Sequence, residues 1–114
     1  MPPDCLFCRI VAGEIPADVV HRDDTVLAFR DINPQAPTHI LVISKAHIAS
    51  AADLRATDGE LLGALFATVA DLADREGLRH GWRVVTNVGP DAGQSVHHLH
   101  LHLLGGRPMA WPPG

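Results

Sequence analysis

The sequence predicts an α+β fold in which a five-stranded antiparallel sheet is combined with one long and one short helix. Five segments have the alternating or continuous apolar character of strands, whereas one long stretch has helical periodicity. The connections between neighbouring strands are short, which favours antiparallel pairing. We therefore expect residues 1–114 to form a single domain, with residues 105–114 as an extended, proline-rich C-terminal tail.

The N-terminal half is predicted to contribute a short helix, a hairpin and a central strand. Two aspartates, Asp23 and Asp24, favour a tight turn between two strands. The strand near residue 40 is almost continuously apolar, which is typical of a strand buried on both faces. In order, the expected segments are residues 5–12 (short helix), 18–22 and 25–30 (hairpin), 31–37 (loop) and 39–45 (central strand).

The long helix is expected after Thr57, which fits a capping box with Glu60 three residues later. It should end near Gly77. Apolar residues recur along it at helical spacing, with charged residues between them. These apolar positions are Leu61, Leu62, Leu65, Phe66, Val69, Leu72 and Ala73.

The last predicted strand carries three alternating histidines and follows a strand at residues 82–88 and a glycine-containing loop. On a strand, His98, His100 and His102 would share one face about 6.5 Å apart, with leucines on the other face. Three buried imidazoles are unfavourable without polar partners. Either they ligate a metal, or one is a nucleophile whose neighbours handle protons and an anionic substrate. A histidine-rich polar outer strand is the least favoured interpretation.

The composition restricts the class of protein. Hydrophobic residues make up 46% and charged residues 19%, which is enough for a folded core. The net charge of −4 and the lack of a Lys/Arg cluster argue against a nucleic-acid surface but not against a small nucleotide. No apolar run has transmembrane length and the first residues do not resemble a signal peptide, so we expect a cytoplasmic protein without a membrane partner.

Residues 98–104 match the pattern His-φ-His-φ-His-φ-φ, where φ is apolar. With this motif the chain resembles the Hint branch of the histidine triad (HIT) superfamily, and the resemblance extends from Phe7 to Gly114. The other matching segments are Leu27–Phe29, Asp31–Ile32, Pro34–His39, Leu41–Ile43, Gly93–Val96 and Trp111–Gly114.

This resemblance implies a HIT-like fold and a homodimer that binds a purine nucleoside monophosphate. It implies hydrolysis of phosphoramidates such as adenosine 5′-phosphoramidate. His100 would attack the α-phosphorus to form a nucleotidyl-histidine, which water then hydrolyses. The chemistry agrees, because neutral imidazole is a good nucleophile near neutral pH and, once protonated, a good leaving group from phosphorus. No cofactor would be needed for catalysis.

The matching positions also imply roles for other residues. The catalytic set is His98, His100, His102, Ser95 and the supporting His39. The substrate-binding set is Phe7, Ile10, Ile15, Phe29 and Ile32 around the base, Asp31 at the ribose, and Asn87, Gly93, Gln94, Ser95, His100 and His102 at the phosphate. Without the resemblance, Ser95 and Asn87 would be loop caps, Asp31 a turn former and the apolar residues ordinary core.

The Cys5-x-x-Cys8 sequence is one half of a zinc site. Two buried thiols are the competing interpretation, and a thioredoxin-like motif is disfavoured because no strand precedes it. Some bacterial histidine-triad proteins begin in the same way, and the resemblance implies that His47 and His98 complete a structural zinc site. Such a zinc would not touch substrate, and it would fix the first triad histidine and the N-terminal segment.

The C-terminal tail places Met109 and Trp111 among prolines, where they cannot form a core of their own. We expect a two-fold dimer in which the long helix and the Trp82 strand lie near the interface and the tail reaches toward the partner's active site. The tail placement rests on the resemblance.

Other functions remain open from the sequence. These are a non-catalytic nucleotide-binding or scaffold protein, a zinc hydrolase that uses the triad as ligands, and a dinucleoside polyphosphate hydrolase or nucleotidyl transferase of the same superfamily. Without a P-loop or an evident pair of Mg²⁺ carboxylates, ATP-driven transfer is disfavoured.

Overall fold

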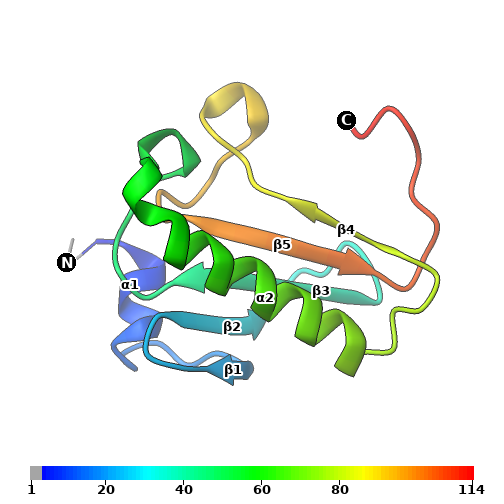
Figure 1. Ribbon diagram of the computed structural model, residues 1–114, viewed down its shortest axis with the longest axis horizontal. Helices are drawn as coiled ribbons and strands as arrows, with labels where there is room; N and C mark the ends of the chain where they lie inside the picture. The colour runs from blue at the N-terminus through cyan, green and yellow to red at the C-terminus, as the bar shows by residue number, and fades with distance from the viewer. Residues whose placement is uncertain (1–3) are drawn as a thin grey trace.

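The computed structural model describes residues 4–114. Within this range it contains five strands, two α-helices and three short 3₁₀ turns. Figure 1 shows how the strands and the two α-helices are arranged. The elements are α1 (Leu6–Val11), β1 (Val19–Arg22), β2 (Val26–Arg30), β3 (Thr38–Ser44), η1 (Ala51–Asp53), η2 (Ala56–Asp58), α2 (Gly59–Arg75), β4 (Trp82–Val85), η3 (Pro90–Ala92) and β5 (His100–Gly105). None of the described helices is long and apolar enough to cross a membrane.

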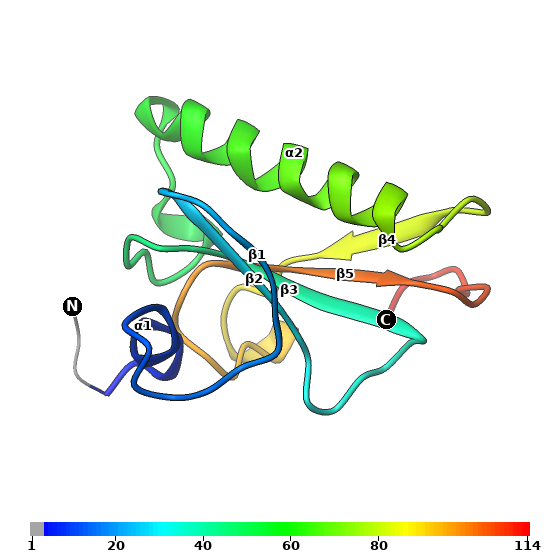
Figure 2. The ribbon, with the colours of Figure 1, turned by 90° about the horizontal axis from the view of Figure 1, so that it is seen from below.

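All five strands pair antiparallel in one sheet, in the order β1-β2-β3-β5-β4. The predicted α+β class and the central position of β3 are therefore confirmed. Figure 2 shows α2 lying along one face of the sheet and α1 on the opposite side. Every residue of β3 is buried, because both faces of this strand are covered.

The two faces of the sheet form two separate cores. On β3, Ile40 and Val42 pack with Leu65 and other residues of α2, whereas Leu41 and Ile43 pack with α1. On β5, the leucines of the triad segment face α2, which leaves the histidines on the α1 side. The period of two along these strands therefore places apolar side chains under α2 and the imidazoles next to α1.

Some predicted element ends were wrong. The long helix begins at Gly59 and not behind a Thr57 cap, because the Asp58 carboxylate accepts the backbone N–H of Arg55 at 2.8 Å and closes the preceding 3₁₀ turn. The helix does end at the expected place, since Gly77 adopts a positive φ of 72° that favours glycine. Phe66, expected on the apolar face, is about half exposed.

The strand predicted over the whole triad is also shorter than expected. β5 begins at His100, so His98 lies in the segment before the strand. The backbone N–H of Leu99 bonds the carbonyl of Ile48 instead of a strand partner. The fourth strand likewise ends at Val85, three residues before its expected end. The loop between them stays free of the sheet, and this loop carries Ser95.

An ion pair fastens the end of α2 to the sheet. Arg30 on β2 donates two hydrogen bonds to the Glu76 carboxylate, at 2.7 and 3.0 Å. This paired geometry is strong for a charged contact. It fixes one end of the strand whose other residues, including Phe29, pack against α1.

Candidate functional site

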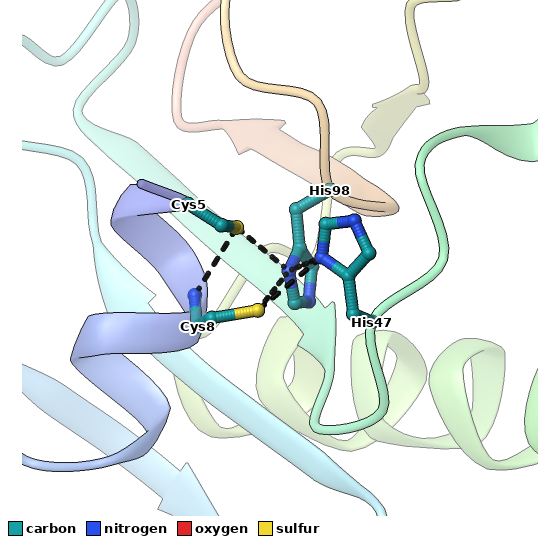
Figure 3. A group of neighbouring side chains, drawn as sticks. All are labelled: Cys5, Cys8, His47 and His98. Carbon is teal, nitrogen blue, oxygen red and sulfur yellow. Dashed lines mark hydrogen bonds between the residues drawn. The ribbon is translucent and has the colours of Figure 1, made fainter. Parts of the chain in front are cut away.

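Four side chains predicted as metal ligands meet between α1 and the segment before β5 (Figure 3). Cys5 and Cys8 come from the start of α1, His47 from the loop after β3, and His98 from the segment before β5. The Nδ1 atoms of the two histidines are 3.3 Å apart. Sγ of Cys8 lies 3.2 Å from Nδ1 of His47 and 3.5 Å from that of His98, and Sγ of Cys5 lies 3.3 Å from Nδ1 of His98.

These distances fit a tetrahedral zinc site. Tetrahedral zinc with ordinary bond lengths separates two nitrogen ligands by about 3.3 Å and a nitrogen from a sulfur by about 3.6 Å. His98 is also oriented for the purpose, since its Nε2 donates to the Ser44 carbonyl at 2.6 Å and leaves the Nδ1 lone pair directed at the cluster. A second hydrogen-bonding group at the far ring nitrogen is typical of histidine metal ligands.

The thiol chemistry of the cluster points in the same direction. Burial, aided by the neighbouring Cys5, raises the pKa of the Cys8 thiol to about 11. A neutral thiol gains little from two imidazole neighbours, whereas a bound divalent cation would favour the thiolate. The donor set of two sulfurs and two nitrogens is typical of structural zinc.

His100 is not one of the four clustered side chains, and it lines a cavity beside them. Its Nδ1 donates to the carbonyl of His98 at 2.6 Å, so its Nε2 keeps a lone pair. Phe7 packs edge-on against both rings, with centroid separations of 5.9 Å to His98 and 5.0 Å to His100. Burial lowers the pKa of His100 below its ordinary value, which keeps the imidazole neutral near pH 7.

A chain of three hydrogen-bonding groups sets the protonation of His102. The backbone N–H of Gln35 donates to Nδ1 of His39 at 3.0 Å. Neutral His39 therefore carries its proton on Nε2, which lies 2.9 Å from Nδ1 of His102. His102 in turn carries its proton on Nε2, an atom that is buried and has no partner among the described residues.

This series of hydrogen bonds leaves the buried Nε2–H of His102 available to a ligand. Burial, together with the neighbouring imidazoles of His100 and His39, lowers the pKa of His102 to about 4. The ring is therefore neutral near pH 7, and a buried donor without an acceptor is unfavourable until something binds. Asp31, His39 and His102 also form a close group, but the proton between the two histidines makes it a relay and not a set of metal ligands.

A cavity of about 380 Å³ opens beside these histidines. All six residues predicted to bind the base and ribose line it, together with Ser95, His100 and His102. Ile32 is 101% exposed at its edge. The size suits a mononucleotide, and the lining combines apolar side chains with a few polar ones. The predicted residues of the wall are Phe7, Ile10, Ile15, Phe29, Asp31 and Ile32.

Three predicted phosphate-site residues do not line this cavity: Asn87, Gly93 and Gln94. The Gln94 side chain instead holds its loop together. Its amide accepts the backbone N–H of Gly89 and donates to the carbonyls of Ala49 and Val96, at 2.9 to 3.1 Å. Gln94 therefore positions the loop that carries Ser95.

The structure adds site residues that the sequence did not single out. Leu41 and Arg30 line the cavity wall, and Leu41 pairs with His102 across two strands. Period-two alternation along residues 39–45 could have indicated Leu41. The Ser44 carbonyl and the Gln35 N–H are backbone groups, so no side-chain pattern indicates them. Leu6, Pro16, Ala17 and Val96 also line the cavity.

The comparisons with known proteins agree with this geometry. The model of the HIT domain matches residues 12–109. The chain belongs to the HIT domain family. Among relatives of this HIT-domain protein, an uncharacterised HIT-like protein of Synechococcus elongatus is 55% identical over the whole of both chains. A 14 kDa zinc-binding protein of Zea mays is 52% identical over 96% of this chain and 87% of its own length.

Solved structures give the same result. The crystal structure of a HIT family hydrolase from Legionella pneumophila superposes with a TM-score of 0.96 at 56% identity, covering 97% of this chain and all of the other. The predicted membership of the histidine triad superfamily is therefore confirmed.

Proposed function

We propose that this HIT-domain protein hydrolyses purine nucleoside phosphoramidates and releases a nucleoside monophosphate such as AMP. The observation that carries the proposal is the pair of neutral histidines at one cavity. His100 offers a lone pair at Nε2, and His102 offers an N–H that has no partner among the described residues. The name of the similar Legionella protein, a HIT family hydrolase, supports hydrolysis as the reaction class.

In the first step, Nε2 of His100 attacks the α-phosphorus and the phosphorus–nitrogen bond to the leaving amine breaks. The nitrogen takes a proton from the solvent and departs as an amine. The proton stays on Nδ1 of His100 and is donated to the His98 carbonyl, which stabilises the positive charge of the nucleotidyl-imidazolium. Nε2–H of His102 and the Ser95 hydroxyl, on the same cavity wall, donate to the phosphoryl oxygens, where charge develops.

In the second step, water attacks phosphorus and the bond to His100 Nε2 breaks. The water releases one proton, so the overall reaction consumes one water and yields the monophosphate and the amine. His100 returns to the neutral state, with its Nδ1 proton still held by the His98 carbonyl. The imidazole is a suitable leaving group because it departs from a cationic form.

The Cys5, Cys8, His47 and His98 cluster would hold a structural zinc. The geometry of the donor atoms and the zinc-binding maize relative support this assignment. When bound, zinc would stabilise the fold at this point and supply no step of the reaction. A catalytic zinc held by the whole triad is disfavoured, because the three histidines do not gather their ring nitrogens at one point: His98 belongs to the Cys5 and Cys8 cluster, whereas His102 lies with Asp31 and His39.

The protein would act as a homodimer. β4 is an edge strand whose first residue, Trp82, is 43% exposed, and Phe66 on α2 is 51% exposed. Trp111 in the tail is 81% exposed. A two-fold pairing of α2 and β4 would cover the first two. Light scattering at micromolar concentration should give twice the chain mass, and a monomer would refute this assembly.

Substrate class is tested by turnover of adenosine 5′-phosphoramidate beside diadenosine polyphosphates. The proposal predicts a higher kcat/KM for the phosphoramidate. Faster cleavage of a diadenosine polyphosphate would favour that hydrolase class, and nucleotide binding without turnover of either would indicate a scaffold. Deleting residues 107–114 should alter substrate selectivity if the tail contributes to the site.

A further inference from the structure

A second cavity, of about 340 Å³, adjoins the nucleotide cavity and has no part in the proposed function so far. The two cavities share three lining residues: Leu6, Ser95 and Val96. Ser95 therefore stands at their junction. The remaining lining residues of the second cavity are Asp4, Cys5, His47 and His97.

In-line displacement at phosphorus predicts that the leaving group departs toward this second cavity. The attacking and leaving atoms lie on opposite sides of phosphorus in the transition state. His100 lines only the first cavity, whereas Ser95 lines both. With the nucleotide in the first cavity and the phosphorus between these two side chains, the group pushed away from His100 moves past Ser95 into the second cavity.

The charge of the second cavity is set by Asp4. Cys5 and His47 belong to the metal cluster, and two thiolates with two neutral imidazoles around Zn²⁺ carry no net charge. Leu6 and Val96 are apolar, Ser95 is uncharged, and no Lys or Arg is among the described residues that line this cavity. The Asp4 carboxylate is therefore the one acidic side chain among them.

We propose that the second cavity is a leaving-group subsite that prefers an amine carrying a second, positively charged group. The inference rests on the proposed phosphoramidase function, and Asp4 is its specificity-determining residue. Leu6 and Val96 would contact the aliphatic part of such an amine, while its distal ammonium group would lie near Asp4. His97, which has no role in the attack on phosphorus, also lines this subsite.

Three adenosine 5′-phosphoramidates test the proposal: the unsubstituted one, the 1,3-diaminopropane derivative and the n-butylamine derivative. The diaminopropane and butylamine derivatives have the same chain length, but only the diaminopropane derivative has a terminal ammonium. The quantity measured is the kcat/KM of the diamine substrate divided by that of the butyl substrate. Comparing this ratio between variants cancels the intrinsic reactivity of each amine.

Removing the charge with Asp4→Asn should lower this ratio about two- to fivefold, the range of an exposed ion pair. Asp4→Lys should lower it further. The wild-type ratio should fall toward that of Asp4→Asn as salt rises, because the pair is solvent-accessible. Asp24→Asn, in the hairpin turn and outside both cavities, is the matched control and should keep the wild-type ratio.

The unsubstituted phosphoramidate separates the possible failures. It has no distal group, so Asp4→Asn should hydrolyse it at the wild-type rate. Because Asp4 adjoins the metal ligand Cys5, zinc content is measured as well and should be equal in all variants. Equal ratios in wild type and Asp4→Asn, with normal turnover of the unsubstituted substrate, would overturn the subsite alone. No turnover of any substrate by wild type would overturn the proposed function and the subsite with it.

Discussion

Replacing Cys8 with alanine should destabilise the protein far more than the loss of a buried side chain explains. Cys8 is 2% exposed, and its sulfur contacts Nδ1 of both His47 and His98. In a metal-free cluster, Cys8→Ala removes one buried sulfur, which is comparable to a methylene and costs about 1 kcal/mol. That is a decrease in Tm of roughly 4 °C for a chain of this length.

If zinc is bound, Cys8→Ala should lose more stability, because it also loses the contribution of zinc to the free energy of unfolding. With free zinc a thousandfold above its Kd, binding adds about 4 kcal/mol to the free energy of unfolding. Cys8→Ala should then lower Tm by roughly 15 to 20 °C in total. Because Phe7 and Ile10 stand on the same short helix as Cys8 and line the nucleotide cavity, affinity for AMP should fall as well. A six-residue helix is not stable alone, so its position depends on its anchors.

The assay is thermal unfolding of tag-free protein with and without a strong chelator, beside metal analysis. Wild type should contain about one zinc per chain, and chelation should lower its Tm by roughly 15 °C, the part of the loss that comes from zinc, whereas Cys8→Ala should not respond. Ile43→Val, in the same core, should lose about 1 kcal/mol and still respond to the chelator. A wild-type protein that is free of metal and equally stable in chelator would refute the zinc site.

Three further perturbations test the other parts of the site. His39→Phe removes the proton donor to His102 and should lower kcat about 10- to 100-fold with little change in KM, with partial recovery in His39→Gln; an unchanged kcat would eliminate the relay. Asp31→Asn should raise KM for a ribonucleotide several-fold and for the 2′-deoxy analogue less, and equal effects on both would contradict a ribose contact. Glu76→Gln should cost about 0.5 to 1 kcal/mol without changing kcat, as measured by urea unfolding. Since the Arg30 guanidinium lowers the pKa of Glu76, this contribution is present above the unfolded pKa of about 4.3 and is lost as pH falls through the lower folded value, so a constant difference from pH 7 to pH 3 would contradict it.

The sequence predicted the arrangement of the sheet because its strands are patterned on both faces. The continuous apolar run of β3 places it at the centre, and the alternation of leucine and histidine separates core from site. Element ends were less predictable. The capping box at Thr57 and Glu60 was wrong because Asp58 takes part in a competing local hydrogen bond with Arg55.

The candidate site was predictable in its side chains and not in its backbone groups. Phe7, Ile10 and Asp31 were placed on the cavity wall from the family resemblance, and the structure brings them together there. The orientation of His98 and His39 depends on the Ser44 carbonyl and the Gln35 N–H, and every residue carries such groups. The Gln94 side-chain amide donates to the Ala49 carbonyl, and the sequence does not indicate this bond because it joins distant parts of the chain.

The most direct test of the central claim is to detect the covalent intermediate on His100. Wild-type protein mixed rapidly with adenosine 5′-phosphoramidate and denatured without acid should show a mass increase of one adenylyl group, located on His100 by peptide fragmentation and lost in acid. His100→Asn should bind AMP, show no adduct and have no turnover. Adduct formation at another residue, or undiminished turnover in His100→Asn, would contradict the mechanism.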